Sequence, residues 1–128
     1  MTSLNKSVYD ALINTSLNDV FQAAKDLAPI IKKTELMESP YFSKECNNQV
    51  YLKPENLQIT GAFKIRGAFN KINKLTTTEK DRGVIAASAG NHAQGVAYAS
   101  KLLGVNATIV MPATTPIIKV EATKEHGA

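Results

Sequence analysis

Lys64 is the residue whose surroundings point most directly to chemistry. It follows Gly61 and Phe63 and immediately precedes a strongly amphipathic segment, so we expect it at the N-terminal end of a helix. A lysine amine can attack an aldehyde to form a Schiff base. Gly61 permits a tight turn, and Phe63 offers a flat apolar face for an aromatic ring. Taken alone, the pattern also fits a surface lysine, and it lacks the glycine and hydroxyl residue that flank the lysine of a Walker motif.

A second candidate site is a run of small and polar residues between a predicted strand and a predicted helix. The run is Ser88-Ala89-Gly90-Asn91-His92. Small residues let backbone amides approach a ligand, and free amides at a helix N-terminus can bind a carboxylate or phosphate. The Asn91 amide could bind a phenolate-like oxygen. Alternatively, Ser88 or Asn91 caps the helix and His92 is a surface residue. A serine-hydrolase elbow is disfavoured because Ala86 stands where that motif needs glycine.

The pattern of apolar residues predicts an α/β fold that positions both motifs. The clearest helix has its apolar stripe at Ile65, Ala68, Phe69, Ile72 and Leu75. The expected elements are a helix between Ser16 and Pro29, a short helix near 41–44, a strand over 49–53, helices over 65–75 and 76–82, a strand over 84–87, a helix over 93–103, a strand over 107–111 and a helix over 116–126. This order predicts a parallel three-layer sheet with flanking helices. Since a closing strand should follow the last helix, we expect a piece of a larger protein.

Composition excludes several classes of protein. The 128 residues carry a net charge of +4, with 44% hydrophobic and 20% charged residues, which is typical of a globular chain. The sequence has no apolar run that could span a membrane, and Met1–Asp10 lacks the apolar core of a signal peptide. One cysteine and two separated histidines give no disulfide or metal cluster. Spread lysines without a nucleic-acid motif disfavour RNA or DNA. We therefore expect a cytoplasmic protein that binds a small molecule.

Together, the motifs resemble the threonine and serine dehydratase family of pyridoxal-phosphate enzymes, which have the tryptophan-synthase-β-like fold. The segments that carry the resemblance are 53–58, 60–68 and 88–95, followed by Met111-Pro112, Lys119, Ala122 and Gly127-Ala128. The resemblance covers nearly the whole chain. It implies that residues 1–48 are a helical segment that joins a large domain. Residues 49–128 would be the small domain of a two-domain fold, incomplete at its C-terminus.

The resemblance also implies roles for the candidate residues. Lys64 would be the Schiff-base lysine of pyridoxal 5′-phosphate, Phe63 would pack beside the cofactor ring, and Asn91 would bind its 3-hydroxyl oxygen. Residues 88–92 would hold the substrate carboxylate, chiefly through backbone amides. The implied reaction converts L-threonine or L-serine to 2-oxobutyrate or pyruvate with release of ammonia, in a homo-oligomer of the full-length enzyme. A racemase reaction on the same motifs stays open.

One absence and two other classes of protein qualify this interpretation. The family's glycine-rich phosphate-binding loop does not occur in the sequence, so we expect the 128 residues alone to be inactive or nearly so. A non-catalytic ligand-binding or subunit-interaction module would share every motif. A flavodoxin-like nucleotide-binding domain would explain the order of elements but not the segment 60–67.

Overall fold

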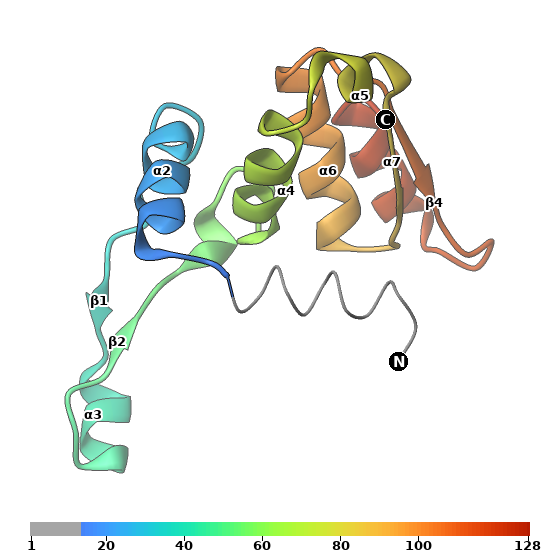
Figure 1. The fold of residues 1–128 in the computed structure, drawn as a ribbon. Coiled ribbons are helices and arrows are strands. Elements are labelled where there is room, and N and C mark those ends of the chain that lie inside the picture. The colour runs from blue at the N-terminus through green and yellow to red at the C-terminus, as the bar shows by residue number, and fades with distance from the viewer. Residues whose placement is uncertain (1–13) are drawn as a thin grey trace, which may run out of the picture. The chain divides into compact units, whose positions relative to one another are not determined.

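The computed structural model describes residues 14–128 and divides the chain into two compact units, one ending at Ile30 and one beginning at Ile31 (Figure 1). The described part of the first unit is dominated by helix α2 (Leu17–Leu27). A capping box starts this helix. The Ser16 hydroxyl accepts a hydrogen bond from the Asp19 amide at 3.2 Å, while the Asp19 carboxylate accepts from the Ser16 amide at 2.8 Å. The predicted helix between Ser16 and Pro29 is confirmed, whereas the prediction for Met1–Asp10 lies outside the described residues.

The second unit begins with a small antiparallel ribbon that the sequence patterns did not predict. Strands β1 (Met37–Glu38) and β2 (Tyr51–Leu52) pair antiparallel, and helix α3 (Pro40–Cys46) connects them. The prediction that the strand over 49–53 joins the parallel sheet is therefore wrong. Pro54 follows the end of β2, as expected. The strand that pairs with β2 is β1, whose two residues are too few to show an alternation of apolar and polar side chains. The ribbon belongs to the compact unit that begins at Ile31. The proposed domain boundary at 48/49 stays a prediction.

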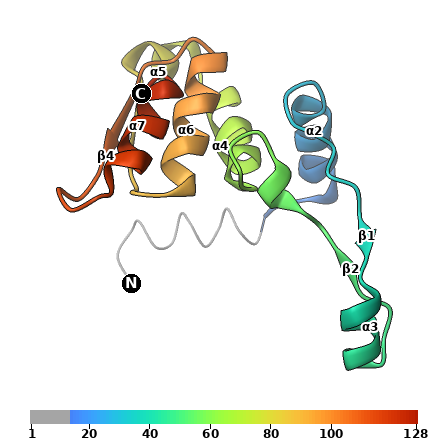
Figure 2. The same cartoon turned by 180° about the vertical axis from the view of Figure 1, so that it is seen from behind.

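A two-stranded parallel sheet follows the ribbon in the second unit. Strands β3 (Val84–Ala87) and β4 (Ala107–Val110) pair in parallel from Val84 opposite Ala107 to Ala87 opposite Val110. Helix α6 (Asn91–Leu102) connects them, while α5 (Thr77–Arg82) precedes β3 and α7 (Ile117–Glu125) follows β4. Figures 1 and 2 show α6 between α4 (Lys64–Asn73) and α7 in both views. The predicted α/β class, with a parallel sheet and flanking helices, is confirmed.

The core of this unit lies where α6 packs on α4 and on one face of the sheet. From α4 the buried side chains are Ile65, Ala68, Phe69 and Ile72, and from α6 they include Ala93, Val96, Ala97, Ala99 and Ser100. The apolar stripe predicted for α4 thus faces the core, although this helix ends at Asn73, before Leu75. Ile85, on the other face of the sheet, is 78% exposed. No helix in residues 14–128 combines the length and apolarity that crossing a bilayer demands.

Ser100 provides a test of this core. Its side chain is 1% exposed, and its hydroxyl oxygen has no hydrogen-bond partner. Because a buried hydroxyl without a partner is unfavourable and alanine is the better helix former, Ser100→Ala should raise the free energy of unfolding by about 1 kcal/mol. Urea denaturation measures the change.

The matched control for Ser100 is Ser43, whose hydroxyl accepts a hydrogen bond from the Val50 amide at 2.9 Å. Ser43→Ala removes that bond and should lower the free energy of unfolding by about 1 kcal/mol. Destabilisation by Ser100→Ala as large as that by Ser43→Ala would contradict the packing described for α6.

Candidate functional site

The loop between β2 and α4 is held by polar contacts with the segment that precedes β1. Within it, residues Glu55–Leu57 form the short helix η1. The Lys53 ammonium group donates to the Thr34 carbonyl oxygen. Gln58 is only 3% exposed, and its side-chain amide donates to the Lys32 carbonyl oxygen and accepts from the Lys32 amide, both at 2.9 Å. These contacts fix the loop at several points before it reaches Lys64.

A bidentate ion pair then joins the loop to the first turn of α4. The Arg66 Nε and Nη2 atoms donate to the two carboxylate oxygens of Glu55 at 2.9 and 2.7 Å. The side chains are 29% and 16% exposed, respectively, so the pair is largely shielded from water. The Thr34 hydroxyl donates to the same carboxylate at 2.6 Å. Lys64 stands between the two anchored residues in sequence, so this ion pair restricts where its backbone can lie.

The ion pair also shifts both ionisation equilibria. The hydrogen bonds from Arg66 lower the pKa of Glu55 to about 2, against the opposing effect of burial and with help from Thr34. The Glu55 carboxylate in turn raises the pKa of Arg66 above its ordinary value. Sequence reasoning did not assign a role to Glu55, Arg66 or Gln58. The sequence pattern that could have indicated these residues is the cluster of polar residues in the loop, with an arginine two positions after the candidate lysine.

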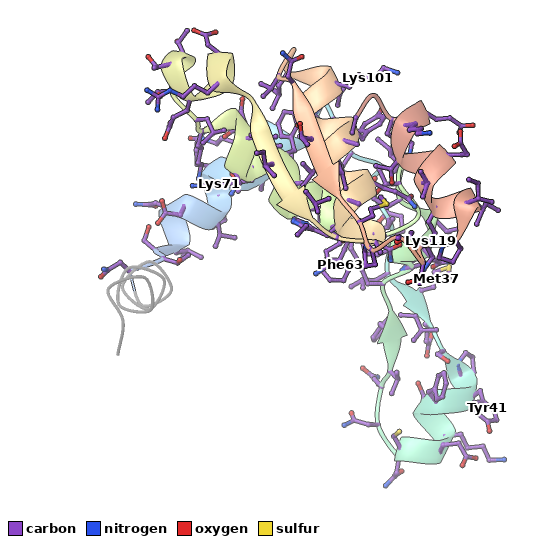
Figure 3. The ribbon with its side chains drawn as sticks, turned by 90° about the vertical axis from the view of Figure 1, so that its right-hand side faces the viewer. Met37, Tyr41, Phe63, Lys71, Lys101 and Lys119 are labelled. Atoms are coloured by element: carbon purple, nitrogen blue, oxygen red, sulfur yellow. The ribbon has the colours of Figure 1, made fainter. Side chains whose placement is uncertain are left out.

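Lys64 and Phe63 are adjacent at the start of α4. Lys64 is the first residue of the helix, and its Nζ atom lies 4.7 Å from the centroid of the Phe63 ring. Phe63 as a residue is 56% exposed, so this side chain beside the amine is open to solvent. Gly61 has φ +66°, the left-handed conformation that glycine adopts most readily, and its amide closes a turn on the Gln58 carbonyl at 2.8 Å. Figure 3 shows Phe63 at the end of the unit toward which β3 and β4 run.

The second motif begins at the carboxyl end of β3. The Ser88 amide donates to the Val110 carbonyl oxygen at 3.0 Å, which extends the sheet pairing by one bond. The Ser88 hydroxyl accepts from the Gly90 amide at 3.3 Å. Helix α6 starts at Asn91 with Gly90 as its N-cap, and no side chain caps it. The alternative that Ser88 or Asn91 caps the helix is therefore wrong.

Lys64 and Asn91 each begin one of two helices that pack on each other, α4 and α6. Asn91 and Gly95 lie one turn apart on the same face of α6, and a side-chain carbon added at Gly95 would be 3.1 Å from the Lys64 carbonyl carbon. His92 lies elsewhere. It lines a cavity of about 460 Å³ between α4, α5 and β3, and neither Lys64 nor Asn91 lines that cavity. Among residues 14–128, His, Cys, Asp and Glu side chains form no group of three that could hold a metal ion.

Comparison with known proteins identifies the class of protein to which this chain is similar. The family model described as "Pyridoxal-phosphate dependent enzyme" matches residues 27–128. The L-threonine dehydratase catabolic TdcB of Staphylococcus aureus (strain USA300) is 55% identical over 114 residues, which are 88% of this chain and 33% of that protein. The chain thus spans about a third of the length of the curated relatives it matches.

Solved structures agree with this match. The serine racemase from Dictyostelium discoideum aligns with a TM-score of 0.84 and 38% identity, covering 89% of this chain and 38% of that one. The processed form of threonine deaminase isoform 2 from Solanum lycopersicum aligns with a TM-score of 0.75 and 39% identity, covering 89% and 33%. This chain belongs to the pyridoxal-phosphate dependent enzyme family. The predicted cofactor is thus the cofactor of its family.

The described residues fit such a cofactor. A primary amine lies beside an accessible aromatic face, as attachment of a flat aldehyde to Lys64 requires. Across from it, α6 has uncapped amides at its first turn, and a side-chain carbon added at Gly90 would meet no atom within 4 Å. The space above this loop is therefore open to a ligand.

The Glu55–Arg66 pair makes stability depend on pH in a defined direction. The pKa of Glu55 falls from an ordinary 4.5 to about 2 on folding, so its contribution is complete above pH 4.5 and is lost as the pH falls toward about 2. A shift of this size corresponds to roughly 2–3 kcal/mol of unfolding free energy. We expect Glu55→Gln to remove that contribution at neutral pH, and the difference from the unsubstituted protein to shrink by about pH 2.

Urea denaturation at several pH values measures this difference. The matched control is Glu121→Gln, because Glu121 forms an exposed ion pair with Lys124 at 3.2 Å that should contribute little. A Glu55→Gln protein as stable as the Glu121→Gln protein at neutral pH would refute the assigned role of the ion pair.

Proposed function

We propose that the protein carrying this chain uses pyridoxal phosphate to dehydrate and deaminate L-threonine, with release of ammonia. The observation that carries the proposal is the placement of the Lys64 amine beside the Phe63 ring, at the start of a helix packed on α6. The likeness to L-threonine dehydratase, at 55% identity, supports the substrate. The name of that relative also supports a catabolic role.

Lys64 has two tasks in this proposal. Its amine would hold the cofactor, and the same amine would take the proton from the substrate Cα atom. Pyridoxal phosphate, when bound, supplies the electron sink that makes this proton removable. The Lys64 Nζ atom lies 4.7 Å from the centroid of the Phe63 ring. An aromatic ring stacked on Phe63 would therefore lie next to the amine.

The loop over residues 88–92 orients the substrate. Its proposed ligand is the substrate carboxylate, which the uncapped amides at the start of α6 would bind with help from the helix dipole. We assign the run Ser88, Ala89, Gly90, Asn91 and His92 to this role. Its amides at residues 89, 91 and 92 would be the donors, because the amides of residues 88 and 90 already donate to the Val110 carbonyl and the Ser88 hydroxyl. The Asn91 side chain is exposed and has no hydrogen-bond partner within residues 14–128, and we propose that it donates to the cofactor's 3-hydroxyl oxygen. Both roles use the open space beside Gly90.

A second candidate function is racemisation of an amino acid. The alignment with the Dictyostelium discoideum serine racemase, at a TM-score of 0.84, favours it. Both reactions begin with removal of the Cα proton and differ in whether the β-hydroxyl leaves or the proton returns on the opposite face. Incubation with L-threonine and L-serine separates them, because dehydration releases ammonia and racemisation does not.

Attachment of the cofactor to Lys64 is the first test of the proposal. Treatment of the full-length protein with pyridoxal phosphate and borohydride, followed by peptide mapping, should place the label on the peptide that contains Lys64. Lys64→Ala should abolish both the label and the release of ammonia from L-threonine.

The control variant is Lys71→Ala, which removes an exposed lysine from the same helix and should leave both signals unchanged. A label on another lysine, or ammonia release that persists in Lys64→Ala, would contradict the proposed site. A label on Lys64 with racemisation and no ammonia would retain the site and replace the dehydratase reaction.

A further inference from the structure

Gly95, in the middle of α6, is packed directly against the backbone of the proposed catalytic lysine. A side-chain carbon built on Gly95 would lie 3.1 Å from the Ile65 amide nitrogen, 3.1 Å from the Lys64 carbonyl carbon and 3.2 Å from the Lys64 carbonyl oxygen. Favourable contacts between carbon atoms lie at about 3.5–4.0 Å. Because the opposing atoms are backbone, no side-chain rotation can relieve such a contact. The first turn of α4 would have to move away from α6.

That displacement would separate the two motifs of the candidate site. Helix α6 begins at Asn91, directly after the loop over residues 88–90, and Asn91 shares a face with Gly95 one turn later. Lys64 is the first residue of α4, so its backbone moves with the turn that touches Gly95. The absence of a side chain at position 95 therefore sets the closest approach between Lys64 and the loop.

We propose that Gly95 is a positioning residue, which places the Lys64 amine at the distance from the Ser88–His92 loop at which the substrate Cα–H bond can be reached. This inference rests on the proposed function, because it assumes that the loop binds the substrate carboxylate while Lys64 removes the proton. A glycine inside a helix is otherwise unfavourable compared with alanine, so close approach of the backbones is the physical reason for it here.

Gly67 offers a matched control on the facing helix. It lies inside α4, one turn after Lys64, and a side-chain carbon built on it would meet no atom within 4 Å. Gly67→Ala and Gly95→Ala thus add the same methyl group to a helix interior. Only the second forces the two helices apart.

The test compares the two variants in the full-length enzyme loaded with pyridoxal phosphate. Gly95→Ala should lower kcat for ammonia release about tenfold, since displacement of a catalytic group by a few tenths of an ångström misaligns proton transfer. KM should stay within about twofold, because the carboxylate-binding loop is unchanged. Gly67→Ala should change neither constant. An unchanged kcat in Gly95→Ala, or a raised KM with normal kcat, would overturn the inference.

A second readout does not depend on activity. In crystal structures of the cofactor-free proteins, the distance between the Cα atoms of Lys64 and Asn91 should be larger in Gly95→Ala by a few tenths of an ångström and unchanged in Gly67→Ala. An unchanged distance in Gly95→Ala would overturn the inference. If Gly95→Ala alone does not fold, the double variant with Gly67→Ala restores helix propensity, and Gly67→Ala then serves as its reference.

Failure of Lys64 as the cofactor-binding residue gives a different result. In that case borohydride trapping in the unsubstituted protein leaves Lys64 unlabelled, which refutes the function and this inference together. A labelled Lys64 with a Gly95→Ala protein of normal kcat refutes the inference alone.

Discussion

The ion pair between Glu55 and Arg66 is the contact on which the geometry of the candidate site most depends. It joins the loop between β2 and α4 to the first turn of α4, with two hydrogen bonds of 2.7 and 2.9 Å. Thr34 adds a third bond to the same carboxylate, so the segment before β1 is held as well. The Lys64 side chain is exposed, and its amine has no hydrogen bond to another described residue, so its placement depends on how the backbone of α4 is held.

The second constraint is the close packing of α4 on α6. The ion pair fixes where α4 begins, and the bare backbone at Gly95 allows this beginning to approach the helix that starts at Asn91. One helix thus carries the proposed catalytic amine and the other the proposed carboxylate site. Buried residues such as Ile65 and Ala97, both 0% exposed, hold the two helices together. Packing in the core and geometry at the site are therefore coupled.

Sequence reasoning predicted the elements well where the pattern was long or strongly punctuated. The apolar stripe of α4 and the helices expected between Ser16 and Pro29 and over 76–82 are confirmed by the structure. It failed for the ribbon over 37–52, because two-residue strands are too short for alternation to appear. For the candidate site it proposed Lys64 and the loop after β3, which stay predictions, but it did not identify the residues that hold them. Glu55 reaches Arg66 across eleven positions, a pairing that depends on the path of the loop and has no local periodicity.

The claim that the ion pair holds Lys64 in place is tested most directly by a double-mutant cycle read out at Lys64 itself. The quantity to measure is the equilibrium constant for attachment of pyridoxal phosphate to the unsubstituted protein, Glu55→Gln, Arg66→Met and the double variant. Each single substitution should weaken attachment about tenfold or more. The double variant should attach pyridoxal phosphate no more weakly than the single variant with the larger loss. Attachment that is unchanged in both single variants, or losses that simply add, would contradict it.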